Sequence, residues 1–112
     1  MTRSAFEKAV REAARGLPKV FRDRIHNVEI IVESRSPDGE LTGLYEGVPL
    51  TERGADRSAE LPDRIILYQK DIEEDCRENG SDLREHIAHV LRHEIAHYFG
   101  ISDERLEDLG AY

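Results

Sequence analysis

"DLREHIAHVLRHEIAHYFG", residues 82–100, decides the fold expected for this chain, because it combines helical periodicity with side chains that bind metals. At about 100° per residue, its apolar side chains fall on one face of a helix, which we expect to meet the core. These side chains are Leu83, Ile87, Val90, Leu91 and Tyr98. Ser81 or Asp82 can cap the helix, with Glu85 at capping-box spacing, and Gly100 can end it in the left-handed conformation.

A carboxylate interrupts this apolar face. Glu94 lies four residues after Val90 and four before Tyr98, where burial of a charge is unfavourable unless something compensates it. Beside the face, four histidines fall within an arc of roughly 80°. They are His86, His89, His93 and His97. A helix with only a structural role would carry leucine at position 94, so the pattern indicates a chemical site.

His93 and His97 are one helical turn apart, so both imidazoles can reach one Zn²⁺ at about 2.0–2.1 Å each. The alternative is that they are ordinary core or surface histidines, because a bare H-E-x-x-H motif also arises by chance. His89 stands about 12 Å from His97 along the helix axis and cannot easily join them. A third protein ligand is therefore expected from beyond the helix.

Asp103 is the candidate for that third ligand, because Gly100 lets the chain reverse direction just before it. The alternative role for Asp103 is to cap a final short helix, "DERLEDL", for which Ser102 is at least as suitable. The two upstream histidines and the glycine favour the ligand role. Three protein ligands with one open position are typical of catalytic rather than structural zinc.

The rest of the chain predicts an α+β fold, in which a small mixed sheet packs on the motif helix. Expected helices lie at 4–17, with Ser4 as the N-cap, around 18–25 and at 72–79; expected strands lie at 28–33, 43–47 and 64–69. Glycine and proline recur between residues 34 and 63, so most of that span should be loop.

The composition fits one soluble domain over residues 1–112, with 38% hydrophobic and 36% charged residues. No stretch approaches the roughly 20 apolar residues needed to cross a bilayer, and the start of the chain does not resemble a secretion signal, so we expect a cytoplasmic protein without a membrane partner. The single cysteine, Cys76, excludes an internal disulfide framework. A net charge of -8 disfavours nucleic acid as a partner.

The spacing His93-Glu94-x-x-His97-x-x-Gly100-x-x-Asp103 resembles the extended zincin signature, in the variant where Asp replaces the third histidine. Together with "GLYEGVPLTERG" and "LPDRIILYQ", it is similar to a small bacterial family of metallopeptidase-like proteins, the minimal zincins. The resemblance covers roughly residues 27–109. It implies that His93, His97 and Asp103 bind zinc and that Glu94 is the catalytic base.

The chain departs from larger metzincins, because Met1 is its only methionine and no methionine turn can follow the motif. We expect a zinc peptidase acting on a peptide or protein substrate, in which zinc lowers the pKa of a bound water to about 7 and Glu94 takes its proton. Tyr45 and Tyr112 are candidates to stabilise the oxyanion. One alternative is a non-catalytic module stabilised by zinc. Another is a zinc ribonuclease, which the net negative charge of the chain disfavours because RNA is also negatively charged.

Overall fold

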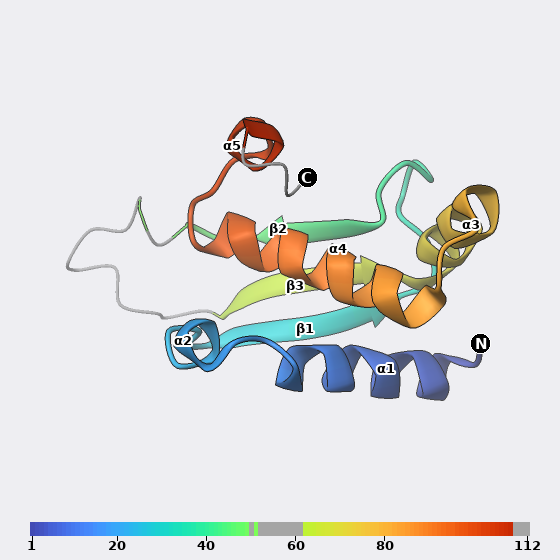
Figure 1. Cartoon of the computed structure of the whole chain (residues 1–112), viewed down its shortest axis with the longest axis horizontal. Coiled ribbons are helices and arrows are strands. Elements are labelled where there is room, and N and C mark those ends of the chain that lie inside the picture. The colour runs from blue at the N-terminus through green and yellow to red at the C-terminus, as the bar shows by residue number, and fades with distance from the viewer. Residues whose placement is uncertain (50, 52–61, 109–112) are drawn as a thin grey trace.

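A computed structural model describes residues 1–49, 51 and 62–108 of the chain (Figure 1). It confirms the expected α+β class, with helices on a small mixed sheet. The elements in chain order are α1 (Arg3–Arg15), α2 (Lys19–Arg22), β1 (Val28–Glu33), β2 (Gly43–Glu46), β3 (Asp63–Tyr68), α3 (Gln69–Asn79), α4 (Leu83–Tyr98) and α5 (Asp103–Asp108). Among these described residues, no helix is long and apolar enough to cross a membrane.

The three strands lie in the order β1-β3-β2, with β3 in the centre. β1 pairs with β3 in parallel, and β2 pairs with β3 antiparallel, in a register that places Tyr45 opposite Ile65. β2 is therefore an edge strand of the sheet that the described residues form. This confirms the short strand expected near residues 43–47.

The helix expected from residues 82–100 is α4, and its apolar face packs on the sheet and on α1 (Figure 1). The side chains of Ile65, Leu67, Ile87, Leu91 and Phe6 are fully excluded from solvent. Burial of an aliphatic side chain of this size stabilises a fold by roughly 1.5–3 kcal/mol, so this layer fixes α4 firmly against the strands. The motif therefore lies on a helix that is packed into the core, and not on a mobile loop.

The ends of the helices agree with the sequence for α4 but not for α1. Asp82 caps α4, because its carboxylate accepts a hydrogen bond from the Glu85 backbone N–H at 3.0 Å. For α1 the predicted cap, Ser4, is wrong: Thr2 is the N-cap and accepts from the Ala5 N–H at 3.0 Å. Both residues carry a hydroxyl, and local pattern alone does not say which one starts the helix.

The segments between these elements are only partly described. Residues 34–42 and 47–49 are turns and irregular structure, as the run of glycine and proline predicts. The remainder of the expected loop, residue 50 and residues 52–61, lies outside the described residues. α3 begins at Gln69, earlier than the residue 72 expected, because the chain passes from β3 into the helix without a connecting loop.

Candidate metal centre

The C-terminal end of α4 turns the chain back toward its own histidines. Gly100 has a φ of 87°, the left-handed conformation that glycine adopts without strain. The N–H of Ile101 donates to the carbonyl of Ala96 at 2.9 Å, and the N–H of Gly100 donates to that of His97 at 2.9 Å. These two bonds form a Schellman motif, so the sequence correctly identified Gly100 as the stop signal.

The reversal brings Asp103 onto the two motif histidines. Asp103 Oδ1 lies 2.8 Å from His93 Nε2 and 2.9 Å from His97 Nε2. Ser102, not Asp103, caps α5, because its hydroxyl accepts from the Arg105 N–H at 3.2 Å. Helix capping therefore belongs to Ser102, and the Asp103 carboxylate faces the two histidines.

A second hydrogen bond orients the His97 ring. Its Nδ1 lies 3.0 Å from the carbonyl oxygen of Ile101, and a carbonyl can only accept, so Nδ1 carries the proton. The other ring nitrogen, Nε2, faces the space shared with His93 and Asp103 and lies 2.9 Å from the Asp103 carboxylate. Holding the far nitrogen of a metal-binding histidine in this way fixes both its tautomer and its orientation.

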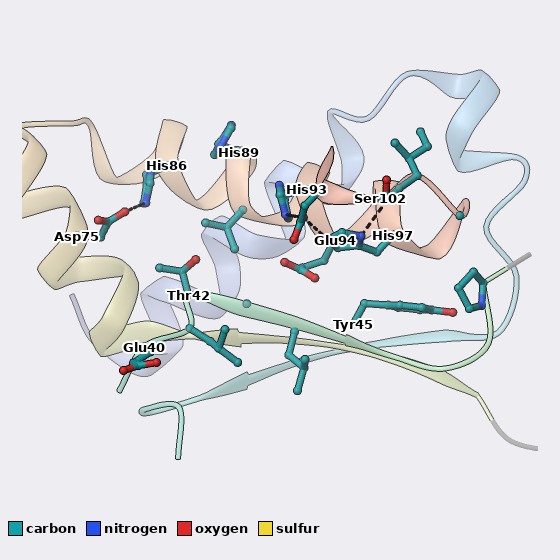
Figure 2. A pocket seen from close by; sticks show the side chains of 18 residues that line it. Glu40, Thr42, Tyr45, Asp75, His86, His89, His93, Glu94, His97 and Ser102 are labelled. Atoms are coloured by element: carbon teal, nitrogen blue, oxygen red, sulfur yellow. Dashed lines mark hydrogen bonds and ion pairs between the residues drawn. The ribbon is translucent and has the colours of Figure 1, made fainter. Parts of the chain in front are cut away.

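Glu94 lies next to the histidines and is buried, as its place on the apolar face predicts (Figure 2). The ligand atoms of His93, Glu94 and His97 all lie within 4.8 Å of one another. Burial raises the pKa of the Glu94 carboxyl above its ordinary value, while His97, His93 and a backbone hydrogen bond from Tyr45 act in the opposite direction. The site thus combines two imidazoles, a partly exposed carboxylate and a buried carboxyl group.

An open groove of about 660 Å³ runs along this cluster. Residues of β2 and the loop before it line one side, α4 lines the other, and the turn into α5 closes one end (Figure 2). Its volume lies within the range of about 300–1,000 Å³ that small-molecule sites occupy. The buried Glu94 and both motif histidines line the groove, so a ligand in it can reach all three.

The other two histidines of α4 form a separate arrangement at the far end of the groove. His86 Nε2 lies 2.6 Å from Asp75 Oδ2, at ion-pair distance, although the angles do not make a hydrogen bond. The His89 ring stacks on His86 with centroids 6.1 Å apart, and burial lowers its pKa. No motif in the sequence pointed to Asp75, which follows two other acidic residues, Glu73 and Glu74.

Tyr45 does not direct its hydroxyl at the metal centre, contrary to the proposed oxyanion role. The hydroxyl donates to Asp63 Oδ2 at 2.7 Å, and the ring packs edge-on against Tyr98. Figure 2 shows the Tyr45 side chain pointing away from His93 and His97. These contacts draw the side chain toward the start of β3, since Asp63 is the first residue of that strand. The other candidate, Tyr112, lies outside the described residues.

Comparison with known proteins connects this site to a family. A solved structure of a conserved hypothetical protein from Thermus thermophilus superimposes with a TM-score of 0.59 at 25% sequence identity, and the alignment covers 97% of each chain. No curated protein matches the chain significantly. The family model for zincin-like metallopeptidases matches residues 23–111. The chain therefore belongs to the zincin-like metallopeptidase family.

Proposed function

We propose that this protein is a zinc-dependent peptidase, and that His93, His97 and Asp103 hold the metal. The observation that carries the proposal is the convergence of two imidazole Nε2 atoms on one oxygen of Asp103, at 2.8 and 2.9 Å. Two nitrogens and a carboxylate oxygen form a donor set that zinc accepts. When bound, zinc would lower the pKa of a water molecule and polarise the substrate carbonyl.

Glu94 is the general base in this proposal rather than a ligand. Its carboxylate lies beside the histidines but is buried between α4 and β2, whereas Asp103 approaches both Nε2 atoms from the side of α5. A carboxylate in this place can accept a proton from water and release it again, as a general base must. Glu94 takes the proton of the attacking water and passes it to the leaving amine.

The substrate in this proposal is an extended peptide lying along the edge of β2. Among the strands of the described residues, β2 pairs with β3 on one side only, and residues of β2 line the same groove as His93. An exposed edge strand can bind an extended peptide through backbone hydrogen bonds, which gives affinity with little dependence on sequence. In this mode a peptide bond of the substrate lies next to Glu94.

The test is digestion of an unbiased peptide library by protein reconstituted with zinc, with products identified by mass spectrometry. We expect cleavage that a chelator abolishes and added zinc restores. A zinc-loaded protein that cleaves no member of a broad library would contradict the proposal and support a non-catalytic zinc-binding module. Failure to bind zinc at all would contradict both.

A further inference from the structure

Gly43, the first residue of β2, has no conformational reason to be glycine. Its φ is not positive, unlike that of four other glycines in the described part of the chain. A Cβ atom added at Gly43 would lie 2.9 Å from Val90 Cγ1, 3.1 Å from Glu94 Cγ and 3.3 Å from Glu94 Oε2. Glycine within a strand often marks a close approach of another group, and here that group is the face of α4 that carries Glu94.

The backbone of Tyr45, two residues after Gly43 in β2, contacts the same carboxylate. Tyr68 N–H donates to the Thr42 carbonyl at 3.0 Å, so Thr42 directs its backbone groups at β3. In an antiparallel pair these directions alternate, which turns the backbone groups of Gly43 and Tyr45 toward the edge of the sheet. The backbone of Tyr45 forms a hydrogen bond with Glu94 there.

We propose that Gly43 is a positioning residue for Glu94, and that the backbone of residues 43–45 is the surface on which this carboxylate rests. The missing side chain at Gly43 leaves room for the Glu94 stem, and the Tyr45 amide holds the carboxylate. The inference rests on the proposed function, in which Glu94 is the base. A displacement of about 1 Å in a reacting group can lower a rate by roughly 100-fold, so displacement of Glu94 from this surface should slow catalysis.

The test substitutes Gly43→Ala in a Val90→Ala background, because a new methyl group at Gly43 also contacts Val90. The background removes that contact and leaves the one with Glu94. Relative to Val90→Ala alone, we expect kcat on the best library peptide to fall about tenfold. This is less than the roughly 100-fold loss expected when a reacting group moves by a full 1 Å. KM and zinc affinity should change less than about twofold, because the new methyl group faces α4, the backbone groups at the edge of β2 keep their positions and the proposed ligands are unchanged.

A second cycle asks whether the effect passes through Glu94. In a protein that carries Glu94→Gln together with Val90→Ala, adding Gly43→Ala should change kcat less than about twofold, because the base is already lost. An equal fall with and without the Glu94 carboxylate would overturn the proposal. Unchanged kcat in the Gly43→Ala, Val90→Ala protein would also overturn it.

A third readout needs no catalysis. In metal-free protein with Val90→Ala, Gly43→Ala should lower the thermal unfolding midpoint by roughly 4 °C, and Glu94→Ala should remove most of this difference by vacating the space. If Gly43→Ala lowers the midpoint equally with and without the Glu94 side chain, Gly43 does not support Glu94. If no variant cleaves any peptide, the proposed function fails, and this unfolding cycle still decides whether Gly43 positions the side chain.

Discussion

Two histidine pairs lie on the same helix, and only one of them is organised around a shared point. His93 and His97 are four residues apart, with ring centroids 4.8 Å apart and both Nε2 atoms within 2.9 Å of one Asp103 oxygen. His86 and His89 are three residues apart and stack at 6.1 Å. Asp75, from the neighbouring helix α3, approaches the second pair. It lies at ion-pair distance from one of the two histidines, His86.

The difference teaches that histidine content alone does not bring metal-binding groups together. Spacing sets whether two rings on a helix converge, and a third group must approach both of them. At His93 and His97 the Schellman turn supplies that group by reversing the chain within six residues. At the other end of α4, Asp75 of α3 lies at ion-pair distance from one histidine, His86.

The largest effect should follow removal of a converging histidine. In the proposed site His93→Ala leaves two protein ligands, and we expect zinc affinity to fall by at least about 100-fold, since loss of even an outer-shell partner typically costs about 10–100-fold. His89→Ala is the matched control and should change affinity less than about twofold. Competition with a chromogenic chelator measures both. Comparable losses in the two variants would contradict the contrast between the pairs.

Glu94→Gln should separate catalysis from metal binding. The amide keeps the size of the side chain but cannot accept a proton, so hydrolysis of the best library peptide should fall by at least about 100-fold. Zinc content and the fold should be retained, because Glu94 is not a ligand in the proposed site. The assay compares the two proteins at equal zinc occupancy. Equal rates would exclude Glu94 as the base.

The buried carboxyl also predicts a pH dependence of stability in the metal-free protein. Burial raises the pKa of Glu94 in the folded state above its ordinary value of 4.5. The folded protein then holds this proton more tightly than the unfolded chain, so stability falls as the pH rises from 4.5 through the raised pKa. Glu94→Gln should lose less stability over that window. Urea unfolding at a series of pH values measures the difference, and parallel curves would contradict it.

The smallest effect should come from the other histidine pair. Asp75→Asn removes the charge that faces His86, and partly exposed ion pairs of this kind contribute up to about 1 kcal/mol. Urea unfolding should therefore show a modest loss of stability, while zinc affinity stays unchanged. A large fall in zinc affinity would show that the far end of α4 participates in metal binding after all.

Local pattern predicted much of this site, because the signals lie close together in the sequence. The period of residues 82–100 identified α4, its apolar face and the buried position of Glu94. Gly100 marked the turn, and the turn placed Asp103 near the histidines. These features depend on helical geometry and on a stop signal, which act over a few residues.

Other features could not be predicted, because they depend on contacts between distant elements. The approach of Asp75 to His86 requires α3 to pack beside α4. The close approach of Val90 and Glu94 to Gly43 likewise requires α4 to pack against β2. The position of a helix on a sheet decides such contacts, and the local patterns of the separate elements do not specify it.

The most direct test of the account is anomalous diffraction at the zinc absorption edge, from crystals of the zinc-loaded protein. We expect one strong peak about 2.0–2.2 Å from His93 Nε2, His97 Nε2 and an Asp103 carboxylate oxygen, with Glu94 close to the ion but not bonded to it. Ligation by Glu94 in place of Asp103, or a peak only at the His86 end of α4, would contradict it.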